Sequence, residues 1–213
     1  MFTGLIEKVC TVSSVSNNAD SMRLTIDLDS LANDAKIGDS IAINGTCLTI
    51  VKLAGSRADF DVSGETLAIS TVGSLKPSAK VNAERAMKAS SRFGGHFVQG
   101  HIDGKAAIKA ITNKGKFRDV TFAAAADLLD MMIPKGSVAV DGISLTIAAV
   151  DQQGFTVAII PETWNNTNLA NSRVGDIVNI ETDIITKTVK KQLEKIMPQK
   201  SSLTIDKLKE LGF

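Results

Sequence analysis

Hydrophobic and polar residues alternate along several short stretches of the chain. Residues 21–28 place Met22, Leu24, Ile26 and Leu28 at every second position, with polar side chains between them. Residues 59–62 and 155–159 repeat the pattern. A period of two with one hydrophobic face is typical of a half-buried β-strand, so these stretches predict strands.

Turn-forming residues separate these strands at short intervals, for example at residues 17–18, 38–39 and 175–176. Several short strands within each half of the chain favour a small antiparallel barrel over an open sheet, because closure removes exposed edges. Residues 30–35 and 123–132 are expected to form short helices packed on the strands.

The chain contains an internal repeat. Residues 40–50 (SIAINGTCLTI) align with residues 137–147 (SVAVDGISLTI) at an offset of 97, and six of the eleven positions are identical. The same offset pairs Glu84 with Glu181, and an offset of 96 pairs Gly4 with Gly100. Because separated blocks share nearly one offset, the sequence predicts a tandem duplication. The expected domains are residues 1–92 and 97–186, followed by a tail at 187–213.

The tail changes period. Val189, Leu193, Ile196 and Met197 fall at helical spacing, and Pro198 ends the predicted helix. A hydrophobic stripe on a helix outside both barrels needs a partner, and another subunit is the natural one.

Composition and charge narrow the function classes. The 213 residues carry a net charge of +1, with no Tyr and one Trp, which gives little attraction to nucleic acid or membranes and few aromatic rings for base stacking. No hydrophobic run is long enough for a membrane helix, and the first residues lack a signal-peptide pattern. Two cysteines, Cys10 and Cys47, are too few for a disulfide scaffold, which favours a reducing, cytoplasmic location.

The two histidines, His96 and His101, lie five residues apart. In an extended strand an odd separation places them on opposite faces, so they would not share a metal ion. No cysteine cluster joins them, and the sequence predicts no metal site. A functional role for one histidine and structural roles for both remain open.

Cys47 and Ser144 occupy the same position in the two halves. Each half therefore has a weak nucleophile or hydrogen-bonding group in an otherwise hydrophobic strand. The nearby Gly45 and Gly142 permit a tight turn or a close backbone approach to a ligand. Cys47 is equally consistent with a nucleophile and with a small buried residue.

Five motifs of the chain resemble the riboflavin synthase family. They are MFTGLIE at 1–7, NGTCLT at 44–49, GGHFVQGHID at 94–103, DGISLT at 141–146 and IPET at 160–163. The motifs follow the family's order and extend over residues 1–186. The resemblance implies an all-β fold of two tandem six-stranded antiparallel Greek-key barrels, plus a C-terminal α-helix that joins three chains into a homotrimer.

The resemblance also implies a transferase activity. Two molecules of 6,7-dimethyl-8-ribityllumazine would react by transfer of four carbons, giving riboflavin and 5-amino-6-ribitylaminouracil without a metal or redox cofactor. In the family the N-terminal barrel of one subunit faces the C-terminal barrel of another. Association with lumazine synthase is left open by the sequence.

The site residues implied by the resemblance fall into two pockets. The N-terminal pocket would be lined by Gly4, Leu5, Ile6, Cys47, Leu48, Thr49, Asp61, Val62, Ser63, Gly64, Glu65 and Thr66. The C-terminal pocket would be lined by Gly100, His101, Ile102, Lys135, Ser144, Leu145, Thr146, Ala158, Ile159, Ile160, Pro161, Glu162 and Thr163. The positions implied for catalysis are Phe2, Ser40, Cys47, His101, Thr146 and Asp183.

The competing interpretation is a non-catalytic antenna protein that binds lumazine or flavin on the same fold. Such relatives tend to lose polar residues of the catalytic pocket, whereas this chain keeps Cys47, Thr49, His101, Ser144 and Thr146. A nucleic-acid-binding barrel is disfavoured by the neutral charge and the scarcity of aromatic residues.

Overall fold

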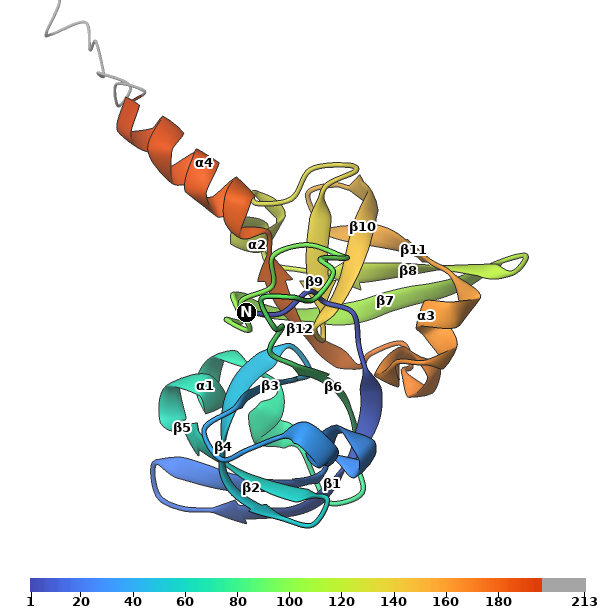
Figure 1. Cartoon of the computed structure of the whole chain (residues 1–213). Coiled ribbons are helices and arrows are strands. Elements are labelled where there is room, and N and C mark those ends of the chain that lie inside the picture. The colour runs from blue at the N-terminus through green and yellow to red at the C-terminus, as the bar shows by residue number, and fades with distance from the viewer. Residues whose placement is uncertain (197–213) are drawn as a thin grey trace, which may run out of the picture.

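The computed structural model, which describes residues 1–196, consists of two closed six-stranded antiparallel barrels. The first barrel contains β1 (Lys8–Asn17), β2 (Ser21–Asp27), β3 (Ser40–Ile43), β4 (Thr46–Ala54), β5 (Arg57–Ser63) and β6 (Lys80–Arg85). The second contains β7 (Gly104–Lys114), β8 (Phe117–Ala123), β9 (Ser137–Val140), β10 (Ile143–Val150), β11 (Gly154–Ile159) and β12 (Ile177–Thr182). The cyclic strand order β1-β2-β5-β4-β3-β6 recurs in the second barrel, which confirms the predicted fold class (Figure 1).

Strand alternation explains the two separate cores. In β2, Met22, Leu24 and Ile26 are fully buried inside the first barrel, whereas Arg23 between them is exposed. In the second barrel Phe122 of β8 stacks on Phe155 of β11, with ring centroids 5.0 Å apart. Each repeat therefore buries its own hydrophobic face, as a pattern with a period of two residues requires.

Short helices connect the strands. They are the 3₁₀ helices η1 (Asp29–Asp34), η2 (Val72–Ser74) and η3 (Asn168–Asn171) and the α-helices α1 (Gly64–Ile69), α2 (Ala126–Leu129) and α3 (Pro161–Asn165). The helix expected at 30–35 is a 3₁₀ helix. The one expected at 123–132 is confined to α2, because β8 continues to Ala123.

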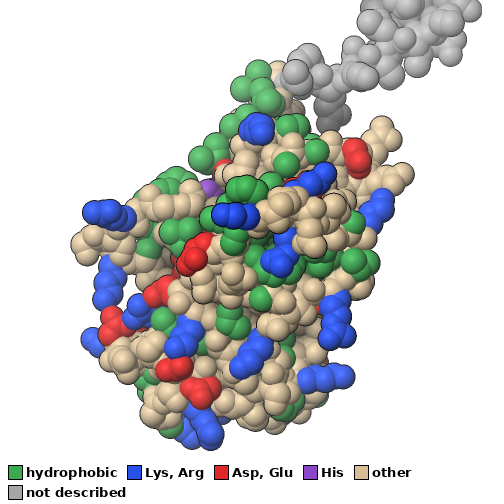
Figure 2. Space-filling view, turned by 90° about the vertical axis from the view of Figure 1, so that its right-hand side faces the viewer, with side chains coloured by type: hydrophobic (Ala, Val, Ile, Leu, Met, Phe, Trp, Pro, Cys, Tyr) green, Lys and Arg blue, Asp and Glu red, His purple; other side chains and the backbone are tan. Residues whose placement is uncertain are grey.

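The predicted C-terminal helix is confirmed as α4 (Ile184–Ile196), which projects away from the second barrel (Figure 1). Along it, Val189, Leu193 and Ile196 are 52%, 47% and 74% exposed, so the hydrophobic stripe has no cover within the described chain. Figure 2 shows hydrophobic side chains at the end of the molecule from which the helix projects. Met197 and the rest of the predicted tail lie outside the described residues, and no described helix is long and apolar enough to cross a membrane.

Equivalent residues of the two repeats meet between the barrels. Phe2 forms a β-bridge with its repeat partner Val98. Gly45 lies against its partner Gly142, where an added Cβ would be 2.6 Å from the Gly142 nitrogen. The close approach predicted for these glycines is therefore an approach to each other. Because each residue contacts its own repeat partner, these pairs indicate an approximate two-fold relation between the barrels.

Side-chain amides hold this interface together reciprocally. Asn82 donates to the Asp141 carbonyl at 2.9 Å, and its repeat partner Asn179 donates to the Asn44 carbonyl at 2.8 Å. Both asparagines are fully buried, so each bond replaces hydration that the amide has lost. These bonds fix the orientation of the barrels and hence of the surfaces between them.

Candidate functional site

The chain segment that precedes each barrel crosses to the other barrel. The Ser144 amide of β10 donates to the Gly4 carbonyl at 2.8 Å, and the Cys47 amide of β4 donates to the Gly100 carbonyl at 2.9 Å. Residues 4–6 therefore lie on the second barrel and residues 100–102 on the first.

Gly4 and Gly100 make these crossings sterically possible. Both have a positive φ, +77° and +82°, which side chains disfavour. An added Cβ would lie 2.6 Å from the Ser144 Cβ at Gly4 and 2.5 Å from the Cys47 Cβ at Gly100. Only glycine lets the backbone approach β10 and β4 this closely.

Two buried glutamates anchor the crossing segments. The Glu84 carboxylate accepts hydrogen bonds from the Thr3 and Gly4 amides at 2.6 and 2.9 Å, and Glu181 does the same for Gln99 and Gly100 at 2.7 and 2.9 Å. Burial raises the pKa of both carboxyls, and these hydrogen bonds oppose the rise. Each segment is thus held by the barrel that follows it in sequence while it packs on the other barrel.

Each barrel carries polar side chains on the outer face of two strands, next to the segment that crosses over from the other repeat. In β3 and β4, Ser40 pairs with Thr49 and Ala42 with Cys47, so these four side chains share one face. The inward neighbour Leu48 packs in the core. The second barrel repeats this arrangement, with Ser137 opposite Thr146 and Ala139 opposite Ser144.

The strands that carry these residues diverge from their neighbours. β4 pairs with β5 only from Ile50 onward, and beyond Phe60 β5 pairs with β2 alone. Residues 47–49, 61–66 and 100–102, here called the first half-site, therefore lie around the place where β4 and β5 separate. Residues 144–146, 158–163 and 4–6 form the equivalent second half-site.

Comparison with known proteins identifies this duplicated arrangement. Residues 3–86 and 99–183 each match the lumazine binding domain. The chain belongs to the riboflavin synthase family. It is 40% identical to the riboflavin synthases of Actinobacillus pleuropneumoniae and Bacillus subtilis (strain 168), with alignments that cover 100% of each chain. The solved structure of LumP complexed with riboflavin shares the fold, with a TM-score of 0.80 and 24% identity over 85% of this chain and 99% of that one.

The crossings correct the grouping of riboflavin synthase site residues expected from the sequence. Gly4, Leu5 and Ile6 were assigned to the pocket of Cys47, and residues 100–102 to that of Ser144. Both assignments are wrong, because the first strand of each repeat begins only after its leading segment has crossed the interface. Ile6 accordingly packs against the core of the second barrel.

The structure separates the six positions expected for catalysis. Cys47 and the exposed His101 lie at the first half-site, and the exposed Thr146 lies at the second. Phe2 is fully buried between the barrels, so its side chain supports the crossing segments rather than presenting a surface to substrate. Of the other two positions, Ser40 pairs with Thr49 of the first half-site, and Asp183 lies between β12 and α4.

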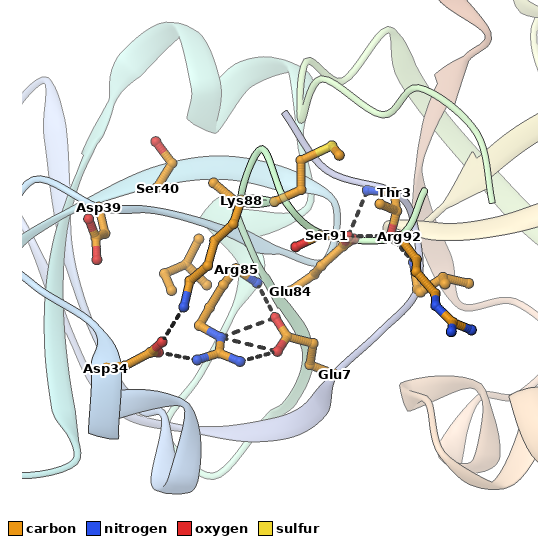
Figure 3. Close-up of a pocket in the computed structure, with 14 residues that line it drawn as sticks. Thr3, Glu7, Asp34, Asp39, Ser40, Glu84, Arg85, Lys88, Ser91 and Arg92 are labelled. Carbon is orange, nitrogen blue, oxygen red and sulfur yellow. Dashed lines mark hydrogen bonds and ion pairs between the residues drawn. The ribbon is translucent and has the colours of Figure 1, made fainter. Parts of the chain in front are cut away.

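Ser40 and Leu5 line a cavity of about 570 Å³ beside β6 (Figure 3). Several charged groups in this cavity form ion pairs: Arg85 binds Glu7 and Asp34, and Lys88 binds Asp34 at 2.8 Å. These ion pairs neutralise Arg85 and Lys88 and weaken the attraction of these two side chains for an anionic ligand.

Asp183 stands at the start of α4, where its carboxylate accepts the Ile185 amide at 2.9 Å. This places a negative charge at the positive end of the helix. The helix is also tied to the second barrel through Lys187, which bonds Asp103 at 2.8 Å. Asp103 directly follows residues 100–102, so the position of α4 is coupled to the crossing segment of the first half-site.

The remaining expected contacts lie on the two helices that follow β5 and β11. Ser63 caps α1 by accepting the Thr66 amide at 3.3 Å, and Pro161 occupies the first turn of α3. Asp61 pairs across the strands with Arg23 at 2.8 Å, and this guanidinium lowers the pKa of the carboxyl. Of the expected second-pocket residues, Ile160 is 49% exposed, so its side chain is accessible to solvent in a single chain.

Lys135 has an unusual backbone. Its φ is +68°, and its amide donates to the Ile147 carbonyl as that of its repeat partner Gly38 does to Ile50. The first repeat thus uses glycine where the second holds a lysine in the left-handed region, at a cost of about 1–2 kcal/mol. Strained residues of this kind cluster at functional sites in proteins.

Sequence reasoning missed three groups near the site. Glu84 and Glu181 were recognised as repeat partners but not as anchors, and Ser137, the repeat partner of Ser40, was not proposed. His96 was left without a role, yet its Nδ1 lies 2.7 Å from the Ser144 Oγ. Within residues 1–196 no cluster of three or more His, Cys, Asp or Glu side chains is placed to hold a metal ion.

Proposed function

We propose that this chain catalyses riboflavin formation from two molecules of 6,7-dimethyl-8-ribityllumazine. Four carbons pass from one lumazine to the other, and the products are riboflavin and 5-amino-6-ribitylaminouracil. The observation that carries the proposal is the pair of equivalent half-sites with different polar groups. Cys47 and His101 belong to the first half-site, and Ser144 and Leu5 to the second.

Two like half-sites suit a reaction between two like molecules. Holding both rings in place converts a bimolecular encounter into a positioned one. In favourable cases this lowers the activation free energy by about 7–11 kcal/mol. The reaction also needs the two rings to behave differently, since one loses a methyl proton and the other receives a nucleophile. The exchange of Cys47 for Ser144 and of His101 for Leu5 supplies that difference.

We further propose that three chains associate through α4 into a homotrimer in the cytoplasm. The exposed stripe of Val189, Leu193 and Ile196 supports a partner helix. The open half-sites support a second wall from another subunit, so that the first half-site of one chain faces the second half-site of the next.

The deciding experiment is incubation of the purified protein with 6,7-dimethyl-8-ribityllumazine while riboflavin absorbance is recorded. We expect riboflavin and the uracil product in equal amounts, at half the lumazine consumed. Binding of the lumazine without any turnover would instead support the antenna interpretation, and absence of both would contradict the proposal.

A further inference from the structure

His96 is one of the most enclosed polar side chains near the second half-site. It lies in the linker between the barrels and is 7% exposed. Its amide donates to the Thr3 carbonyl at 3.1 Å, which fixes the linker against the crossing segment. The imidazole is thereby held over β10, where its Nδ1 meets the Ser144 Oγ at 2.7 Å.

The two ring nitrogens of His96 have different surroundings. Nδ1 bonds Ser144, whereas Nε2 is buried without a hydrogen-bond partner among residues 1–196. Burial lowers the pKa of the ring, which the charge of Asp183 opposes, so the imidazole is neutral near pH 7 and carries one proton. That proton resides on one of the two nitrogens.

The proton's position follows from the cost of leaving each group unpaired. Orphaned buried N–H groups are rarer in proteins than orphaned acceptors, at least for the backbone. A proton on Nε2 would create such an orphan, whereas a proton on Nδ1 is used in the bond to Ser144. The hydroxyl oxygen of Ser144 then acts as the acceptor, and its own proton is free to point outward.

We propose that His96 is a positioning residue that orients Ser144 as a hydrogen-bond donor toward a ring acceptor of the ligand in the second half-site. The ligand group it would meet is a carbonyl oxygen or an unprotonated ring nitrogen of a pteridine. The inference rests on the proposed function, and it deepens it by assigning a direction to one hydrogen bond.

This arrangement makes the two half-sites chemically unequal. At the first half-site the matching residue is Cys47, whose thiol is a weak donor, and the linker that carries His96 reaches Ser144 instead. A hydroxyl fixed by a buried imidazole loses little rotational freedom when it binds, so its bond to the ring is preorganised. The second half-site is thus the one that withdraws electron density from its ring through a fixed hydrogen bond.

A double-mutant cycle with the full-length protein tests the coupling between the two residues. The kcat and KM for the lumazine are measured for wild type, His96→Leu, Ser144→Ala and the double variant. We expect His96→Leu to lower kcat/KM by about ten- to hundredfold, as displacing a positioned group does. In the Ser144→Ala background the same change should have an effect below about twofold, because the group that His96 orients is absent.

His96→Asn is the matched conservative variant, because its amide nitrogen can take the place of Nδ1. We expect it to recover most of the activity lost in His96→Leu. Fluorescence of the single Trp164 checks that each variant is folded. Wild-type kinetics in His96→Leu, equal losses in both backgrounds, or a folded but inactive His96→Asn would each overturn the proposal.

Nitrogen NMR gives a readout that does not need turnover. The chain has only two histidines, so their ring signals are assigned by comparing wild type with His96→Asn. We expect a neutral ring protonated at Nδ1, and an Nε2-protonated or charged ring at pH 7 would refute the assigned direction. If wild type forms no riboflavin, the proposed function fails, whereas this NMR test of the His96–Ser144 bond still stands.

Discussion

Asp141 is a fully buried carboxyl at the interface between the barrels, where its repeat partner is the neutral Asn44. Its Oδ1 accepts the Asn179 amide at 2.8 Å and its Oδ2 accepts the Asn168 side-chain amide at 2.7 Å. Burial outweighs both bonds and raises the pKa of the carboxyl from 3.8 to about 6. That difference corresponds to about 3 kcal/mol of stability that depends on pH.

The direction follows from which state keeps the proton. Well below pH 3.8 the carboxyl is protonated in both the folded and the unfolded chain, and its burial then causes no pH-dependent loss of stability. Between pH 4 and 6 the unfolded chain ionises while the folded protein retains the proton, so stability falls as pH rises. Asp141→Asn cannot ionise. Its free energy of unfolding relative to wild type should therefore rise by about 3 kcal/mol between pH 4 and pH 7.5.

Asp141→Asn also changes the hydrogen bonds to Asn168 and Asn179 at every pH, which adds a constant offset of about 1–3 kcal/mol. The slope with pH does not depend on the offset. Denaturant titrations at several pH values, followed by Trp164 fluorescence at one protein concentration, measure the slope in the barrel that contains Asp141. The swap variant Asn44→Asp with Asp141→Asn should restore a wild-type slope. A difference between Asp141→Asn and wild type that is flat with pH would refute the reasoning.

Three further changes test separate parts of the molecule. Lys135→Gly, which copies Gly38 of the first repeat, should raise the free energy of unfolding by about 1 kcal/mol and lower turnover. Unchanged turnover would show that the Lys135 ammonium group has no role in the reaction. Cys47→Ser should lower single-turnover rates by about ten- to hundredfold. Full activity in Cys47→Ala would show that the thiol only fills space and takes no part in the reaction. Val189→Glu with Leu193→Glu should dissociate the trimer in sedimentation experiments without unfolding the barrels, and an intact trimer would contradict the role of α4.

The barrels could be predicted because their cause is local. Alternation in β2 and β11 follows directly from one buried face, and a single offset between repeats reveals the second barrel once the first is recognised. The stripe on α4 was visible for the same reason. The short helices α1 and α3 were not, because each has fewer than two turns and therefore shows no periodicity. α1 begins at a Ser63 cap and α3 at Pro161.

The composition of each half-site could not be predicted from these patterns. Residues 4–6 and 100–102 form no regular strand, so their sequence carries no period that says which barrel they contact. The destination is set by non-local bonds, from Ser144 to Gly4 and from Cys47 to Gly100. His96 belongs to the linker outside both aligned copies of the repeat, and its role depends on a contact 48 residues away.

The crossings also explain where the two repeats have been free to differ. At the axis, Gly45 and Gly142 contact each other, and Asn82 and Asn179 make reciprocal bonds, so a change in one copy disturbs the other. Side chains on the outer faces have no such reciprocal partner and can diverge into two unlike half-sites.

The pair Asn44 and Asp141 departs from this rule at the axis, and the departure has a local compensation. Asn168, whose repeat partner is Thr71, donates to the Asp141 carboxylate and also approaches the Asn44 side-chain oxygen at 3.3 Å. The Asn168 side-chain amide thus supplies the hydrogen-bond donor for the second carboxylate oxygen of Asp141. A duplicated interface can therefore lose its symmetry at one position when a neighbouring substitution supplies the missing hydrogen bond, and the remaining cost is the desolvation that the pH titration measures.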